Sequence, residues 1–129
     1  MAHPIQIILA RQLAGYLRVP LFLVDPKGNL IFYNEPAEVL LGRRFEDTGT
    51  MPVEEWASAF APVDTAGQPI PPEDRPLMIT LKQQRPAYRC FAIRGLDGVL
   101  RRIEVASIPI AGLQGEFLGA AALFWELKE

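Results

Sequence analysis

Residues 21–42 of this chain read LFLVDPKGNLIFYNEPAEVLLG, and they carry most of the information about its fold. The β-branched and aromatic runs Leu21–Val24 and Leu30–Tyr33 predict two short strands. Between them, residues 25–29 contain a side-chain acceptor, a proline and a glycine, which together are typical of a tight turn. Asn34 can accept a hydrogen bond from a helix N–H group, so a helix is expected to begin there. The predicted order is therefore strand, turn, strand and Asn-capped helix.

The composition describes an ordinary globular protein of one domain. Of the 129 residues, 50% are hydrophobic and 22% are charged, and a chain of this length can bury roughly two-thirds of its unfolded surface. The formal net charge of −2 gives no indication of binding to nucleic acid or to an anionic membrane. The single cysteine, Cys90, excludes an intrachain disulfide. No apolar run approaches the roughly 20 residues that cross a bilayer, so we expect a cytoplasmic protein without membrane insertion.

An amphipathic helix is predicted ahead of the first strand. Apolar residues recur there at helical spacing and form one face, which we name the N-terminal stripe. The stripe consists of Ile5, Ile8, Leu9, Leu13, Tyr16 and Leu17. A helix this short is marginal alone, so its apolar side must be buried against something. We therefore divide the chain into an N-terminal helix over residues 1–19 and a globular domain over residues 20–127.

Further helices and strands are predicted after the first hairpin. Apolar periodicity and proline or acidic starts indicate helices over residues 37–41, 52–60 and 71–84. Three strands follow, over residues 88–94, 100–110 and 117–127, with turns at residues 96–98 and 112–115.

This order of elements, β-β-α-α-α-β-β-β, resembles that of PAS domains, most of which are sensory and interaction modules. Residues 64–77 resemble the loop and long helix of a sub-pattern common in bacterial sensor kinases, Asp64-x-x-Gly67-x-Pro69-x-Pro71-Pro72-Glu73-Asp74-x-Pro76-Leu77. Three further motifs resemble the last two hairpins of that sub-pattern: Asp97-Gly98, Ser107-x-Pro109-Ile110 and Gly115-x-x-x-Gly119. The resemblance covers about residues 13–127. It implies an α+β fold whose five-stranded antiparallel sheet has helices on one face and the N-terminal amphipathic helix on the other.

The resemblance also assigns strand residues to two faces, since successive side chains of a strand point to opposite sides. Those on the concave face, beneath the helices, are the candidate ligand-binding residues. They are Phe22, Val24, Ile31, Tyr33, Phe91, Ile93, Ile103, Val105, Ser107 and Phe117, with Ala121 beside them. The Tyr33 hydroxyl needs a partner in such an apolar pocket, either a ligand or a neighbouring protein group.

The opposite face is apolar as well, although a single antiparallel sheet normally leaves one side polar. It is expected to carry Leu21, Leu23, Leu30, Phe32, Ile108, Leu118, Ala120, Ala122 and Phe124. The N-terminal stripe, from the same chain or from a partner, is the obvious cover, because an exposed patch of this size would be an association site. We expect a homodimer whose interface comprises Ile5, Ile8, Leu9, Leu13, Tyr16, Leu17, Leu21, Leu23, Phe32 and Phe124.

No haem, photoactive flavin or metal site is predicted. The only histidine, His3, lies in the tail before the first helix and cannot serve a buried haem. The photoactive flavin-binding PAS relatives need a cysteine in an Asn-Cys-Arg-Phe-Leu-like helix motif, whereas residues 42–46 read GRRFE. Cys90 is expected to be a buried structural cysteine that faces away from the pocket. We therefore expect no cofactor, while an unidentified small molecule can still bind.

These features favour a signal-transduction module, not an enzyme, that binds a small ligand or a protein partner and signals through dimer packing. Residues 125–129 lack the exit motif of many relatives, so the output, a kinase or transcriptional effector outside this chain, stays open. One alternative is a pure dimerisation module with a filled core. Another is a small cone-shaped α+β enzyme of the steroid-isomerase type. That enzyme would need an acid or base in its pocket, where only Tyr33 and Ser107 are polar, so no catalytic residue is proposed.

Overall fold

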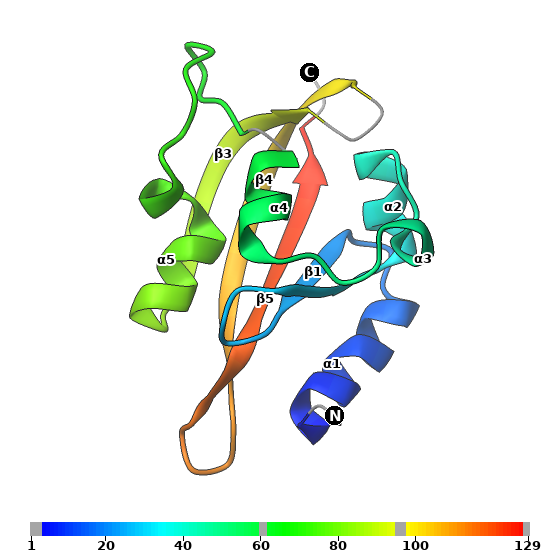
Figure 1. Cartoon of the computed structure of the whole chain (residues 1–129), viewed down its shortest axis with the longest axis vertical. Coiled ribbons are helices and arrows are strands. Elements are labelled where there is room, and N and C mark those ends of the chain that lie inside the picture. Colours follow the sequence, from blue (N-terminus) through cyan, green and yellow to red (C-terminus); the bar gives the residue numbers. More distant parts are fainter. Residues whose placement is uncertain (1–3, 60–61, 95–97, 128–129) are drawn as a thin grey trace.

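A five-stranded antiparallel sheet forms the centre of the molecule, with strand order β2-β1-β5-β4-β3 (Figure 1). The computed structural model describes residues 4–59, 62–94 and 98–127. The strands are β1 (Leu21–Val24), β2 (Leu30–Tyr33), β3 (Ala87–Arg94), β4 (Leu100–Ala111) and β5 (Phe117–Glu126). The sheet confirms the expected α+β fold, and every strand lies within one residue of its predicted bounds.

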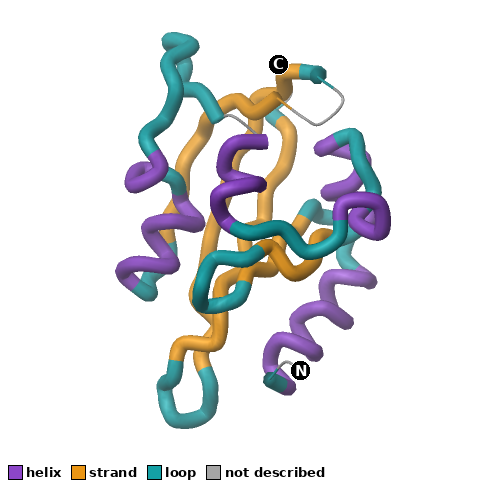
Figure 2. Tube along the Cα trace, viewed as in Figure 1, coloured by secondary structure: helices purple, strands orange, loops and turns teal. Residues whose placement is uncertain are grey.

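Helices pack on both faces of the sheet (Figures 1 and 2). One face is covered by α1 (Ile5–Tyr16), and the other by α2 (Glu35–Leu41), α3 (Phe45–Thr48), α4 (Val53–Ala59) and α5 (Pro76–Gln83), which follows the 3-10 helix η1 (Pro72–Asp74). The sequence does not predict the single turn of α3. The expected helix end at residue 60 and the turn positions 96 and 97 lie outside the described residues. Within the described ranges, no helix combines the length and apolarity that a bilayer crossing needs.

The helix predicted over residues 71–84 is interrupted at Arg75. Pro76 begins α5, and a residue that precedes proline is disfavoured in helical backbone. Arg75 accordingly has extended dihedral angles, φ −84° and ψ 139°. The segment therefore forms two helices, η1 and α5, with Arg75 at the corner between them.

Asn34 joins the end of α1, the start of β1 and the start of α2. Its Oδ1 accepts hydrogen bonds from the backbone N–H groups of Leu21 (3.0 Å) and Ala37 (3.2 Å). Its Nδ2 donates to the carbonyl oxygens of Ala14 (3.0 Å) and Val19 (2.9 Å). The amide therefore uses its full hydrogen-bonding capacity in a side chain that is only 2% exposed. The predicted helix cap is confirmed, and the same amide also holds α1, which the sequence does not indicate.

A bulge in β2 overturns the predicted orientation of Ile31. Leu23 pairs with Phe32 and Val24 pairs with Leu30, so Ile31 is an additional residue in this strand. Leu30 therefore packs in the core beneath the helices, while Ile31 packs on the α1 face. Ile31 is consequently not on the concave side, where we expected it as a ligand-binding residue.

A second bulge changes the faces of β5. Ile110 pairs with Gly119 and Ala111 with Phe117, so Leu118 is additional. Beyond it, Ala120, Ala122 and Phe124 point to the helix-side core and Ala121 points to α1, the reverse of the prediction. Phe124 is thus a core residue and not part of a dimer interface. Gly119 has a φ of 143°, and a Cβ at this position would collide with the carbonyl oxygen of Val24 on β1.

α1 packs on the sheet with a different side from the N-terminal stripe. Its buried residues are Ile7 and Ala14, and Ala10 and Leu17 are partly buried beside them. The alanines let the helix lie close to the strands. The remaining members of the stripe are exposed, and they are Ile5, Ile8, Leu9, Leu13 and Tyr16. Apart from Leu17, the stripe therefore does not cover the sheet of its own chain.

The sheet residues beneath α1 are largely removed from solvent. Leu21 and Leu23 are buried there, so α1 of the same chain covers two residues that we expected at a dimer interface. Phe32 is partly buried, and the guanidinium of Arg11 lies 4.6 Å from its ring centroid. The exposed part of the predicted interface is consequently the N-terminal stripe without Leu17, next to the partly buried Phe32.

The segment that contains α4 is fixed to the sheet at both ends. The backbone groups of Met51 and Leu30 exchange two hydrogen bonds, of 2.7 and 3.0 Å, on β2. Val63 and Ala92 exchange two more, of 2.8 and 2.9 Å, on β3. Met51 and Val63 flank α4, so this helix is held over the concave face.

Replacing Asn34 with Asp should destabilise the protein by more than the loss of a helix cap alone would. The carboxylate still accepts from Leu21 and Ala37, but its second oxygen faces the carbonyls of Ala14 and Val19. We expect the free energy of unfolding at neutral pH, measured by urea denaturation, to fall by about 3 kcal/mol. Lower pH should restore part of this loss, because the folded state then favours a protonated carboxyl that can donate one hydrogen bond.

Asp64→Asn is the matched control for this experiment. Oδ1 of Asp64 accepts hydrogen bonds from the N–H groups of Ala66 and Gln68 at an exposed turn. An amide oxygen retains both bonds, so the stability should change by less than about 0.5 kcal/mol. An Asn34→Asp variant as stable as this control would contradict the role assigned to the Asn34 amide.

Candidate functional site

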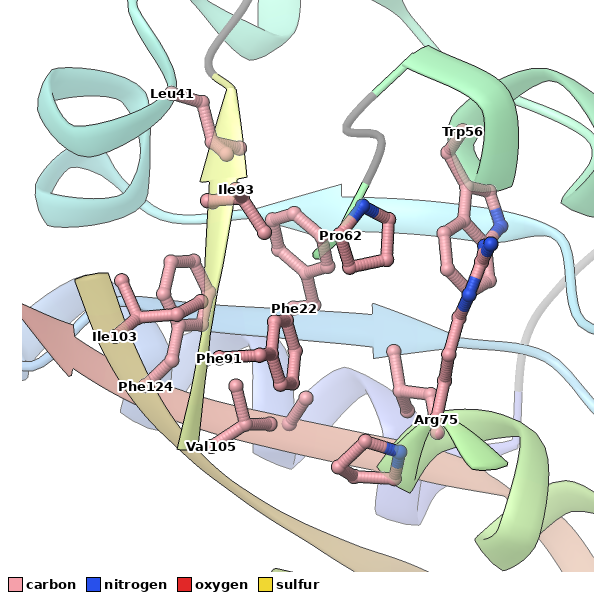
Figure 3. Close-up of a pocket in the computed structure, with 13 residues that line it drawn as sticks. Phe22, Leu41, Trp56, Pro62, Arg75, Phe91, Ile93, Ile103, Val105 and Phe124 are labelled. Atoms are coloured by element: carbon pink, nitrogen blue, oxygen red, sulfur yellow. The ribbon is translucent and has the colours of Figure 1, made fainter. Parts of the chain in front are cut away.

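A cavity of about 70 Å³ lies between the concave face of the sheet and the helices that cover it (Figure 3). Its lining residues are Phe22, Leu41, Trp56, Pro62, Arg75, Pro76, Leu77, Phe91, Ile93, Ile103, Val105, Ala122 and Phe124. Arg75 is the one charged side chain among these described residues. The cavity is therefore an apolar site, and Arg75 contributes to its wall mainly through the aliphatic part of its side chain.

The predicted ligand-binding residues divide into three groups. Those that line the cavity are Phe22, Phe91, Ile93, Ile103 and Val105. Those on the same side of the sheet but outside the lining are Val24, Tyr33, Ser107 and Phe117. Ile31 lies on the other face, as the bulge in β2 requires.

Sequence reasoning missed the cavity residues that come from helices, loops and the far half of β5. These are Leu41, Trp56, Pro62, Arg75, Pro76, Leu77, Ala122 and Phe124. A signal existed for Trp56, which belongs to the apolar side of a predicted helix. The side chains of β5 could not be placed correctly without knowledge of the bulge at Leu118.

Aromatic contacts and one hydrogen bond hold the cavity wall. The rings of Phe22 and Phe124 meet edge to face, with centroids 5.1 Å apart and planes at 78°. Nε1 of Trp56 donates to the carbonyl oxygen of Gly28 (2.8 Å), which anchors the indole of α4 to the turn between β1 and β2. These contacts preform the wall before any ligand arrives, as is usual for small-molecule sites.

The hydroxyl of Tyr33 is engaged by the protein itself. It donates to the carbonyl oxygen of Arg43 (3.0 Å) and lies 3.0 Å from Oγ1 of Thr48. Burial raises the pKa of the phenol above its ordinary value, and the hydrogen bond to Thr48 opposes this effect. The sequence allowed either a ligand or a protein group as the partner of the Tyr33 hydroxyl. In the structure, its partners are protein groups.

Ser107 joins β4 to α5. Its Oγ lies 2.5 Å from Oγ1 of Thr80, which in turn donates to the carbonyl oxygen of Arg85 (2.8 Å). Because the Thr80 proton is used in that second bond, Ser107 is the donor to Thr80. Both hydroxyls are buried, and this chain of bonds positions the helix that carries Pro76 and Leu77.

Arg75 occupies the corner between η1 and α5 and extends toward Trp56 (Figure 3). Its Nε donates to the carbonyl oxygen of Ile70 (3.1 Å), and the side chain is partly buried. Burial lowers the pKa of this guanidinium, while the negative charge of Glu73 raises it. Arg75 thus presents a partly desolvated positive charge beside an apolar cavity.

Cys90 is exposed, which corrects the expectation of a buried structural cysteine. Its Sγ lies 3.6 Å from Oε2 of Glu104, the cross-strand neighbour on β4. The residue lies outside the cavity lining, as expected. Alternation along β3 correctly predicts that Cys90 faces away from the cavity. It does not predict that this outer face of β3 is open to solvent.

Comparison with known proteins reveals a likeness of structure. No family model matches the sequence, and no curated protein matches it. The PAS domain of a protein from Colwellia psychrerythraea has 18% identity and a TM-score of 0.65, with 94% of this chain and 96% of that chain covered. A PAS domain from a two-component sensor histidine kinase has 12% identity and a TM-score of 0.63, covering 95% and 97%. The LOV protein of Rhodobacter sphaeroides has 16% identity and a TM-score of 0.75, covering 97% and 69%. Identities this low establish the fold alone.

Tyr33→Phe should cost about 1 kcal/mol of stability at neutral pH, because the bonds of the hydroxyl are lost. The raised pKa of Tyr33 stabilises the folded protein up to about pH 10, and this contribution is lost as the pH rises through the folded-state pKa. The Phe variant should therefore lose less stability than the wild type as the pH rises above about 10, when the free energy of unfolding is measured by urea denaturation at a series of pH values.

Tyr88→Phe, at a side chain that is 74% exposed, is the control and should behave as the wild type. Parallel alkaline profiles for wild type and Tyr33→Phe would refute this role.

Proposed function

We propose that this chain, which has the PAS fold, is a sensory module that binds a small and largely apolar molecule in the cavity and signals through the packing of two copies. The observation that carries the proposal is the apolar cavity between the sheet and α2, α4 and α5. The PAS domain of a sensor histidine kinase among the similar structures supports a role in signalling. The output, a kinase or transcriptional effector, would lie outside this chain, and the cytoplasmic location stays a prediction.

The volume of the cavity sets the size of the molecule. A cavity of about 150 Å³ is known to accept benzene. The cavity here, at about 70 Å³, therefore accepts a group smaller than a benzene ring unless its walls move. A short alkyl chain meets this limit, and the apolar lining favours it by the hydrophobic effect.

A contiguous set of contacts joins the cavity to α1. Leu41 lines the cavity from the last turn of α2. The same helix begins at Asn34, whose Nδ2 holds the carbonyls of Ala14 and Val19 at the end of α1. A ligand that shifts α2 would thus act on the helix that carries the N-terminal stripe.

The N-terminal stripe is the proposed contact between two copies. Leu9 and Leu13 are 55% and 59% exposed, and Tyr16 is 87% exposed, although all three are large and apolar or amphipathic. Contiguous exposed apolar surface of this kind is typical of association sites. The stripe also borders the end of α1 that Asn34 holds, so a change there would reach the contact directly.

Two other functions compete with this proposal. A pure dimerisation module would share the stripe and leave the cavity empty of any ligand. An isomerase-like enzyme would need a general acid or base in the cavity, and Arg75 is the only ionisable side chain among the described lining residues. A guanidinium keeps its proton at neutral pH and is a poor general base, so the enzyme is the weaker alternative.

Val105→Phe should fill the cavity and abolish ligand binding at little cost in stability. The probes are linear alcohols and carboxylates of about three to four carbons, tested by thermal unfolding. A compound at about 100 times its dissociation constant stabilises the wild type by about 2.7 kcal/mol, which raises its melting temperature by several degrees. The variant should show no such rise, because its phenyl ring occupies the same space.

Val24→Phe is the matched control, since Val24 is fully buried in the same core but does not line the cavity. Overpacking at that position should cost about 1–3 kcal/mol. If Val105→Phe is equally destabilising and no probe raises the wild-type melting temperature, the ligand-binding function is wrong and the dimerisation module is favoured.

The double variant Leu9→Glu/Leu13→Glu should be a folded monomer. Both side chains are exposed within one copy, so the charges cost little there, whereas a helix contact would bury them unpaired. Light scattering coupled to size exclusion should give a dimeric mass for the wild type and a monomeric mass for the variant. Val39→Glu, at a residue of α2 that is 73% exposed, should leave the dimer intact. A monomeric wild type, or a dimeric double variant, would contradict the proposed contact.

A further inference from the structure

We propose that two copies of this chain interlock, so that the N-terminal stripe of each copy lies on an open part of the other copy's sheet. This inference rests on the proposed function and names the surface that the stripe contacts. That surface, which we name the open sheet face, is the convex side of β3, β4 and the end of β5. It consists of Tyr88, Cys90, Ala106, Ile108 and Trp125.

Strand alternation and register place these residues on one surface. Ala106 alternates with core residues of β4, so it points away from the helix-side core. Its partner on β3 is Tyr88, and in the next row Cys90 and Trp125 flank Glu104. Nε1 of Trp125 donates to Oε1 of Glu104 (3.0 Å), so this carboxylate already has a hydrogen-bonding partner when another molecule covers the face.

α1 of the same chain covers only the other part of the convex side. The residues that pack against it come from β1, β2 and the adjoining parts of β5 and β4. In Figure 1, α1 lies on the β1 side of the sheet, away from β3. Tyr88, Ile108 and Trp125 are consequently exposed. An apolar surface of this kind on a sheet is typical of a site that another molecule covers.

The convex side therefore has the shape of a step, because α1 stands one helix diameter, about 10 Å, above the open sheet face. A two-fold rotation about an axis along the strands places the α1 of a second copy on that lower part, and the first α1 then lies on the second copy's open sheet face. The two helices lie side by side between two sheets. A contact of stripe on stripe would instead leave the two open sheet faces separated by two helix diameters, about 20 Å.

The area of the stripe also argues for a second surface. A helix of 12 residues is about 18 Å long and about 10 Å wide, so one side of it offers on the order of 200 Å². A stable interface buries about 800 Å² on each partner. The interlocked contact uses two surfaces of each copy and so buries about twice the area of a stripe-on-stripe contact. It also covers a tyrosine and a tryptophan, Tyr88 and Trp125, which are residue types enriched at the centres of interfaces.

The single cysteine of the chain provides a direct test, since Cys90 lies on the open sheet face. Each exposed residue of the stripe is replaced with cysteine in turn, once with native Cys90 and once with Cys90→Ser. After mild oxidation, covalent dimers are measured by electrophoresis without reductant. At least one variant that keeps Cys90 should form a covalent dimer, because a disulfide requires Cα atoms within about 7 Å. The same variant with Cys90→Ser should not, and neither should the wild type.

Substitutions on the open sheet face give an independent test. Ile108→Glu and Tyr88→Glu each place a charge that is solvated in one copy and buried in the dimer, so each should raise the dimer dissociation constant about a hundredfold or more. Light scattering coupled to size exclusion measures this change, and cooperative thermal unfolding shows that each variant is folded. Val39→Glu, on α2 at the concave side, is the control and should leave the constant unchanged.

The outcomes separate this inference from the proposed function. If Leu9→Glu/Leu13→Glu gives a monomer while Ile108→Glu and Tyr88→Glu remain dimers, the stripe contacts another surface, so the inference is wrong while the proposed function stands. Covalent dimers that form equally well with Cys90→Ser, or that form with no variant that keeps Cys90, would likewise overturn the inference alone. If the wild type is a monomer, the contact between two copies fails in both.

Discussion

The side-chain amide of Asn34 is the interaction on which the arrangement of the layers depends. It ends one strand of the first hairpin, begins α2 on the concave side, and holds the last turn of α1 on the convex side. An amide suits this junction because it offers two donors and an acceptor with two lone pairs, and neither a carboxylate nor a hydroxyl supplies that set. The two layers of helices are therefore connected through one buried polar side chain rather than only through the sheet between them.

A sheet that is apolar on both faces needs cover on both, and the two sides solve this differently. On the concave side, aromatic and aliphatic residues such as Phe22, Trp56 and Leu77 fill the space under four helices except for the small cavity. On the convex side, α1 reaches the strands through Ile7 and two alanines. This close packing turns the larger side chains of α1 outward. The same choice of helix face thus buries the sheet and leaves the N-terminal stripe exposed.

Much of the fold could be inferred from the sequence because its signals are local. The turn after Val24, the cap at Asn34 and the strand limits follow from residue types at fixed spacing. The two bulges could not be inferred, since a single extra residue in a ladder depends on the register between strands and leaves no mark in either strand alone. Each bulge inverts the faces beyond it, which is why Ile31 and Phe124 were misplaced. Arg75 and Leu41 were missed because helix periodicity does not specify how a helix lies on a sheet.

The two hydrogen-bonded bridges beside α4 have a consequence for solubility. Strands β2 and β3 form the edges of the sheet, where unpaired backbone groups can recruit a strand from another molecule and start aggregation. The backbone of Met51 pairs with that of Leu30 on the β2 edge, and the backbone of Val63 pairs with that of Ala92 on the β3 edge. One connecting segment therefore interrupts both edges at once. Loss of its attachment would leave β3, eight residues long, open to intermolecular strand pairing.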